Sequence, residues 1–92
     1  MELERFQGVI GETYLARDAE RGVASTVAWL AEEMGELAQA VRKGSPGQQL
    51  HELGDVLAWL ASLANQLDLS LDDAAARYAG GCPRCGASPC TC

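Results

Sequence analysis

The sequence has no cysteine before residue 82, no long apolar run and no stretch with the alternating pattern of a β-strand. A membrane-spanning helix needs about 18 or more consecutive apolar residues, so we expect no membrane partner. The lack of β-branched alternation argues against a sheet and favours an all-α fold. The opening residues 1–6 are acidic and polar, unlike a signal peptide, which favours a cytoplasmic protein.

Basic residues are also scarce. The 92-residue chain has 7 Lys and Arg against 13 Asp and Glu, a net charge of -6. A groove for nucleic acid needs many cationic side chains, so we expect no nucleic acid polymer as partner. A chain of this size buries only about 60–65% of its unfolded surface, and its core is marginal. We therefore expect an oligomer, a bound metal, or both.

Residues 1–79 are rich in Ala, Leu and Glu and predict a helical domain, while residues 80–92 form a Gly/Pro/Cys tail. The spacing predicts helices over about 3–17, 25–43, 46–67 and 70–78, with Ser25 or Thr26 as the second N-cap. Gly44 can cap the second helix, and the following Ser-Pro-Gly-Gln forms a capping box for the third. Five leucines of the third helix are expected to point inward: Leu50, Leu53, Leu57, Leu60 and Leu67.

The short linker at residue 44 predicts an antiparallel hairpin of the second and third helices. In such a hairpin, two residues that lie opposite each other on the two helices have sequence numbers that add up to the same value all along the hairpin. The sum is 88 for four pairs: Glu36 with Glu52, Glu33 with Asp55, Trp29 with Trp59, and Thr26 with Ser62. Four carboxylates should therefore meet at two adjacent levels, with the tryptophans beside them.

The residues of these four pairs form one stripe on each of the two helices, and neither stripe contains a Lys or Arg. Two like charges about 4 Å apart repel by about 4 kcal/mol at an effective dielectric of 20, so a bound cation or protonation is needed. Carboxylate oxygens favour Mg²⁺ or Mn²⁺. A stripe of glutamates is more often a solvated face, and the tryptophans can be plain core residues or line a nucleobase pocket. The only histidine, His51, is expected to be solvated.

Residues 29–40 and 51–64 resemble the MazG-like nucleotide pyrophosphohydrolases, whose hallmark is Glu-Glu-x-x-Glu, a gap, then Glu-x-x-Asp. The resemblance covers about residues 15–78, and it extends to small relatives that end in a similar Cys-rich tail. It implies an all-α helical bundle completed by oligomerisation as a homodimer or homotetramer. It also implies hydrolysis of a nucleoside triphosphate to the monophosphate and pyrophosphate, of house-cleaning type.

The resemblance also implies roles for individual residues. Glu33, Glu36, Glu52 and Asp55 would hold Mg²⁺, and Glu32 would bind a second ion or orient the attacking water. The nucleobase would rest on the Trp59 side, with Trp29 and Ser62 nearby. Relatives often carry further basic or Asn residues on a longer last helix. Here the available phosphate partners are Arg42, Lys43, Arg77 and Arg84, of which we consider Lys43 and Arg77 the main candidates.

The tail carries Cys82, Cys85, Cys90 and Cys92. Four thiolates suit a tetrahedral Zn²⁺ with a structural role, in which the ion pins the C-terminus of the domain. The spacing between the last two cysteines is tighter than usual. A disulfide-bonded tail, a disordered tail and an iron–sulfur site remain alternatives.

Two other functions remain open from the sequence. The shortened last helix also fits a non-catalytic helical dimerisation module, or zinc-stabilised interaction module, that has kept the fold. A specialised pyrophosphohydrolase acting on one pyrimidine nucleotide or on phosphoribosyl-ATP is the other alternative.

Overall fold

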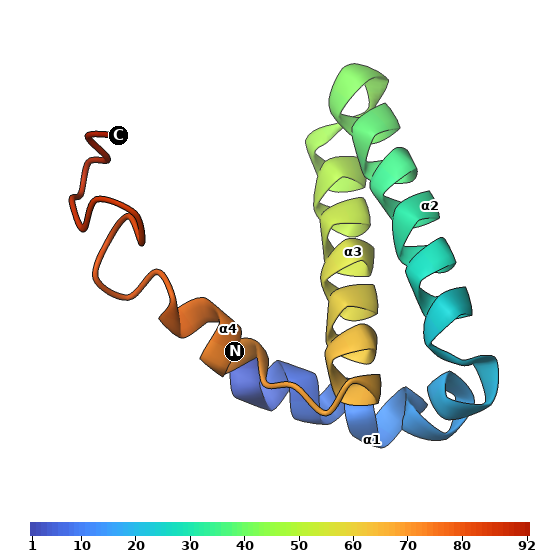
Figure 1. The fold of residues 1–92 in the computed structure, drawn as a ribbon. Coiled ribbons are helices and arrows are strands. Elements are labelled where there is room, and N and C mark those ends of the chain that lie inside the picture. Colours follow the sequence, from blue (N-terminus) through green and yellow to red (C-terminus); the bar gives the residue numbers. More distant parts are fainter.

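A computed structural model describes residues 1–92 and confirms an all-helical chain. Its four helices are α1 (Leu3–Arg21), α2 (Val23–Lys43), α3 (Pro46–Gln66) and α4 (Leu71–Ala76). Figure 1 shows α2 and α3 as an antiparallel hairpin, with α1 lying across its open end. The short α4 and the C-terminal tail extend away from the hairpin. None of the helices combines the length and the apolarity that crossing a membrane would require.

The turn of the hairpin confirms the predicted capping box. The backbone N–H of Gln48 donates to Ser45 Oγ at 3.2 Å, and the backbone N–H of Ser45 donates to Gln48 Oε1 at 2.7 Å. Gly44 precedes this box with φ of -97°, so it is not a left-handed cap. Glycine is needed there because a Cβ would lie 2.8 Å from the carbonyl oxygen of Ala40. The close packing of this turn fixes the register of the two arms.

The boundary between α1 and α2 differs from the prediction. Helix α1 continues to Arg21 and α2 begins at Val23, so Ser25 and Thr26 are not the N-cap. The break is a single residue, Gly22, with φ of 88°, which glycine adopts without the strain of a Cβ. The Thr26 hydroxyl instead donates to the Gly22 carbonyl at 3.1 Å. A one-residue break turns the chain sharply and leaves no loop between α1 and the hairpin.

Gln7 of α1 joins the two ends of the helical domain. Its side chain donates to Asn65 Oδ1 at 3.0 Å and accepts from the backbone N–H of Leu71 at 2.8 Å. Helix α4 begins at Leu71, and Ser70 is its N-cap, whose hydroxyl accepts a hydrogen bond from the backbone N–H of Asp73. It ends at Ala76, two residues before the predicted end, and turns follow.

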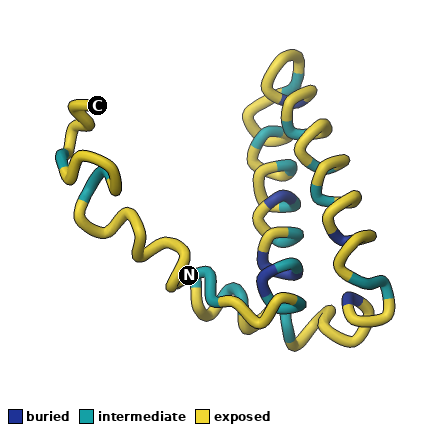
Figure 2. The backbone as a smooth tube through the Cα atoms, in the orientation of Figure 1, coloured by how far each residue is buried: buried dark blue, intermediate teal, exposed yellow.

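The expectation that the leucines of α3 point inward is wrong for the single chain. Only 8 of 92 residues are buried, and four of these are on α3, where Figure 2 shows buried positions in the part of the helix near α1. The five leucines are 40–73% exposed. Helix α3 packs against α2 and α1, but these contacts do not cover its whole apolar stripe, so the leucines remain exposed. The buried apolar residues are Ile10, Ala40, Val56, Ala61 and Ala64.

Candidate active site

The hairpin brings together carboxylates that are distant in the sequence. Glu33 and Glu36 of α2 and Glu52 of α3 each offer an oxygen, and these oxygens lie within 4.8 Å of one another. Asp55 lies one turn further along α3 and forms a second group of the same size with Glu52 and His51. Glu36 and Glu52 therefore come together as the constant residue sum predicts, whereas Asp55 is grouped with Glu52 and His51 and not with Glu33. We call Glu33, Glu36, Glu52 and Asp55 the acidic cluster.

The acidic cluster opposes its own ionisation. Burial, followed by the nearby charges of Glu36 and Asp55, raises the pKa of the Glu33 carboxyl above its usual value. Burial and the charge of Glu36 also raise the pKa of Glu52, while neighbouring His51 acts in the opposite direction. His51 itself is 71% exposed, as expected, and its Nε2 lies 3.4 Å from Asp55 Oδ2. No Lys or Arg forms an ion pair with the cluster.

Two oxygens of the acidic cluster are buried without any hydrogen-bond partner: Oε2 of Glu33 and Oε2 of Glu52. A buried carboxylate oxygen with no partner costs free energy unless a proton or a cation satisfies it. Oxygen donors of this kind are what Mg²⁺ and Mn²⁺ prefer. The residues present thus fit a divalent cation bound between the two arms of the hairpin.

The tryptophan rings form the next level of the hairpin. Trp29 and Trp59 stack with ring centroids 6.0 Å apart and ring planes inclined by 12°. The guanidinium carbon of Arg21, from α1, lies 4.8 Å from the Trp59 ring centroid. Arg21 Nη1 is in turn paired with Asp18 Oδ1 at 2.6 Å. An aromatic wall fixed by α1 therefore lies directly beside the acidic cluster.

Two cavities lie next to the acidic cluster. One, of about 410 Å³, is at the turn end of the hairpin and is lined by Glu36, Glu52 and Lys43 together with Gln39 and Gln48. The other, of about 300 Å³, lies between α1 and α3. It is lined by Asp55, Trp59 and Ser62 on α3, and by Tyr14, Arg17, Asp18 and Arg21 on α1. The cluster thus has a polar cavity on one side and a partly aromatic cavity on the other.

Two of the predicted site residues lie apart from the acidic cluster in the single chain. Glu32 is exposed and joins neither carboxylate group. Arg77 lies just after α4, where its guanidinium contacts the Tyr78 ring at 5.5 Å, and it lines neither cavity. Ser62 and Lys43, in contrast, each line one of the cavities. Thr26, paired with Ser62 by the residue sum, instead accepts a hydrogen bond from Gln66 at 2.7 Å.

The sequence analysis did not identify the contribution of α1. Asp18 is only 1% exposed, and its Oδ2 has no hydrogen-bond partner. The i, i+3 spacing of Asp18 and Arg21 is visible in the sequence and predicts their pairing. Their position over Trp59 depends on how α1 packs across α3, which no local pattern specifies.

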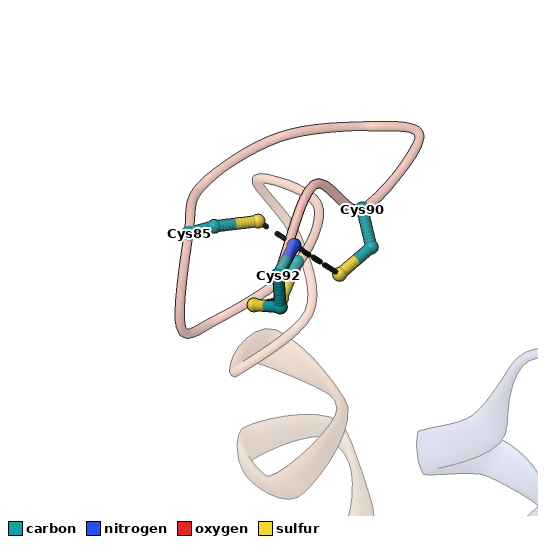
Figure 3. Close-up of side chains that lie close together, drawn as sticks. Cys85, Cys90 and Cys92 are labelled. Carbon is teal, nitrogen blue, oxygen red and sulfur yellow. Dashed lines mark hydrogen bonds between the residues drawn. The ribbon is translucent and has the colours of Figure 1, made fainter.

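The four tail cysteines are also brought together, in the segment that Figure 1 shows extending away from the hairpin. Figure 3 shows three of them, Cys85, Cys90 and Cys92. Hydrogen bonds from backbone N–H groups, with that of Thr91 foremost, lower the pKa of the Cys85 thiol to about 5. Hydrogen bonding with Cys90 and the other thiols raises the pKa of Cys92 to about 11. The cluster therefore favours a mixture of thiolate and thiol.

The site is a helical hairpin that brings carboxylates from both of its arms to one level, in an all-helical chain. Residues 21–80 match the model of the MazG nucleotide pyrophosphohydrolase domain. This match covers more than half of the chain, and the protein belongs to that family. None of the curated proteins matches the sequence.

Proposed function

We propose that this protein is a Mg²⁺-dependent nucleoside triphosphate pyrophosphohydrolase that removes unwanted nucleotides. The observation that supports this most directly is the convergence of Glu33, Glu36 and Glu52, with two buried oxygens that lack partners. Membership in the MazG nucleotide pyrophosphohydrolase family agrees with that chemistry. The acidic chain also needs a cation to accept an anionic substrate, because like charges would otherwise repel the phosphates.

Glu33, Glu36, Glu52 and Asp55 would hold the ion. Bound Mg²⁺ supplies charge neutralisation on the phosphate oxygens and lowers the pKa of a coordinated water. Mn²⁺ has the same preference for oxygen ligands and would substitute. No Lys or Arg is paired to the carboxylates, so no cationic side chain would compete with a divalent ion for them.

In the reaction, the oxygen of a water molecule attacks the α-phosphorus of the nucleotide. The bond from that phosphorus to the bridging α–β oxygen breaks, and pyrophosphate leaves with the electron pair. The proton of the water goes to a carboxylate. We propose Glu32 for this role from the family resemblance; it is next to Glu33 on α2 but is exposed and outside the acidic cluster in the single chain. Positioning and charge stabilisation provide most of the catalysis in such transfers.

The two cavities suggest how the nucleotide lies. Lys43 is the only cation lining the polar cavity, and it would bind the departing pyrophosphate together with the amides of Gln39 and Gln48. The nucleobase would enter the other cavity, against Trp59 and Ser62. Trp29 supports Trp59 from behind through the stacked pair. The α-phosphate would then lie between the cavities, at the acidic cluster.

We also propose that the active protein is a homodimer or homotetramer. The chain exposes 6532 Å² of surface, whereas a compact 9.7 kDa monomer exposes about 5,100 Å². Its radius of gyration is 15.2 Å, against about 12 Å for a compact chain of this length. The extended tail contributes to this excess of about 1,400 Å², and a standard interface covers roughly 800 Å² per partner. The exposed apolar side chains on α2 and α3 would supply that interface.

The test is a pyrophosphate-release assay with each natural nucleoside triphosphate and common damaged analogues, with and without Mg²⁺. We expect Mg²⁺-dependent release by the wild type and at least a hundredfold loss in Glu36→Gln. Glu20→Gln, an exposed change on α1, is the matched control and should retain full activity. Equal background rates in the wild type and Glu36→Gln with every nucleotide would overturn the proposal.

Glu32→Gln tests the base separately. Removal of a proton acceptor lowers kcat and leaves the Mg²⁺ concentration for half-maximal rate unchanged. Removal of an ion ligand, as in Glu36→Gln, raises that concentration as well. An increased Mg²⁺ requirement in Glu32→Gln would show that Glu32 binds an ion instead. Unchanged kcat would exclude both roles.

A further inference from the structure

The C-terminal tail contains a second cluster of metal-ligand side chains, unrelated to the carboxylates. Cys82, Cys85, Cys90 and Cys92 come from different positions in an 11-residue loop, yet their four sulfur atoms all lie within 4.8 Å of one another. Figure 3 shows the loop folded back so that the side chains of Cys85, Cys90 and Cys92 point toward one another. Such convergence of four cysteines is not required by any apolar core, because the tail has none.

The sulfur separations match those of a bound tetrahedral ion. Cys82 Sγ lies 3.7 Å from Cys92 Sγ, and Cys85 Sγ lies 3.9 Å from Cys90 Sγ. With zinc–sulfur bonds of about 2.3 Å, the edge of a regular tetrahedron of sulfurs is about 3.8 Å. A disulfide requires about 2.05 Å, so these pairs are not bonded to each other.

The backbone supports the same arrangement. The N–H of Thr91 donates to Cys85 Sγ at 3.4 Å, and the N–H of Cys92 donates to Cys90 Sγ at 3.4 Å. Hydrogen bonds of this kind orient metal-bound ligands and disperse the charge of thiolates. The loop between the first two cysteines closes through the N–H of Gly86, which donates to the Cys82 carbonyl at 2.7 Å. Gly86 has φ of 73°, a conformation that favours glycine.

The tail is separate from the helical domain. It stands apart from the hairpin in Figure 1, and every hydrogen bond of residues 82–92 stays within that segment. Most of these residues are exposed, so burial of apolar surface cannot fold them. A metal bound here would therefore order the C-terminal segment itself.

We propose that Cys82, Cys85, Cys90 and Cys92 bind one Zn²⁺ with tetrahedral geometry, and that the ion folds the tail as a unit of its own. Four sulfur ligands fill the coordination shell of zinc and leave no position for substrate, so the site is structural. Each bound zinc displaces the protons of the cysteines that are still thiols. This proposal does not depend on pyrophosphohydrolase activity.

The experiment measures metal content in the full chain, purified under reducing conditions without chelator. We expect one zinc and no iron per chain by elemental analysis. Replacement by Co²⁺ should give the intense visible bands of a tetrahedral cobalt–thiolate centre. Cys90→Ser should lose most of the zinc, whereas Thr91→Ala, which keeps the backbone N–H donor, should retain it.

Limited trypsin digestion tests the folding role. Arg84 is the only basic residue of the tail, and it lies between two of the ligands. The zinc-loaded chain should resist cleavage after Arg84, while chelator treatment or Cys90→Ser should make that bond at least tenfold more sensitive. Stoichiometric iron, two disulfides, or free thiols without metal in the purified chain would overturn the proposal. Equal cleavage with and without zinc would overturn its folding role.

Discussion

Trp29 and Trp59, 30 residues apart in the sequence, stack in the hairpin with ring centroids 6.0 Å apart and ring planes inclined by 12°. Arg21 lies over the Trp59 ring and is itself held by the buried carboxylate of Asp18. The pair marks the boundary between the acidic cluster and the aromatic cavity. It also shows that the register of the two arms is the one predicted from their constant residue sum.

Trp59→Ala should weaken nucleotide binding. Stacking of a base on an aromatic ring is worth about 1–3 kcal/mol, so we expect KM to rise by about fivefold to a hundredfold. The carboxylates stay in place, so kcat should change much less. Steady-state kinetics separates these two parameters, with circular dichroism as a check on folding. Tyr78→Ala, an exposed aromatic outside both cavities, is the control; a fall in kcat alone for Trp59→Ala would contradict the role.

Glu33→Gln should stabilise the chain without Mg²⁺ at neutral pH. Because burial and neighbouring carboxylates raise the pKa of Glu33 above 4.5, folding favours its protonated form. That contribution is fully present below the usual pKa and is lost as the pH rises through the raised value. Thermal melts across this range should show wild-type stability falling with pH more steeply than that of Glu33→Gln.

Mg²⁺ should make the wild type more stable than Glu33→Gln. The ion binds the deprotonated cluster of the wild type and raises its Tm by mass action, whereas the variant has lost a ligand. If the stability of the two chains had the same pH dependence without Mg²⁺, the pKa of Glu33 would not be raised in the folded state. Identical stabilisation of both by Mg²⁺ would show that Glu33 is not a ligand.

Gly44→Ala should destabilise the hairpin. A Cβ at this position would lie 2.8 Å from the oxygen and 2.9 Å from the Cα of Ala40, both of which are backbone atoms. Overpacking of this kind costs about 1–3 kcal/mol. Each 1 kcal/mol lowers the Tm of a domain this size by about 4–8 °C, which calorimetry resolves.

Gly8→Ala is the matched control for Gly44→Ala. Gly8 is inside α1 with nothing within 4 Å of the added methyl group. Alanine in place of glycine within a helix is worth about 0.5–1 kcal/mol, so this variant should melt at a higher temperature. If both variants shifted Tm in the same direction, the steric explanation for Gly44 would be wrong.

Leu53→Glu should reduce the oligomer to a monomer. Leu53 is 55% exposed on α3, among the apolar residues that the single chain leaves uncovered. A buried, unpaired carboxylate at an interface is strongly unfavourable. Analytical ultracentrifugation should show a lower mass than for the wild type. Leu69→Glu is the control. Leu69 is also an exposed leucine, at 61%, but it lies outside the hairpin, so this change should leave the mass unchanged. A wild-type protein that is already monomeric would contradict the proposed assembly.

The sequence by itself determined the number and order of the helices, and the turn and register of the hairpin, but not the boundary between α1 and α2 or the end of α4. Capping at Ser45 and the close approach at Gly44 are local interactions, so their signals lie within a few residues. The periodicity of a helix also fixes which residues share a face, and this placed Glu33 and Glu36 opposite Glu52. The four-cysteine tail was evident for the same reason, because its ligands lie close together in the sequence.

Only the tertiary structure decided which helix faces are covered. A periodic pattern shows that the leucines of α3 form a stripe, but burial depends on a neighbour, and α1 covers a different face. The placement of Asp18 and Arg21 over Trp59 likewise depends on the sharp break at Gly22 and the crossing of α1 beneath the hairpin. Contacts between distant segments depend on packing in three dimensions, which no short window of sequence encodes.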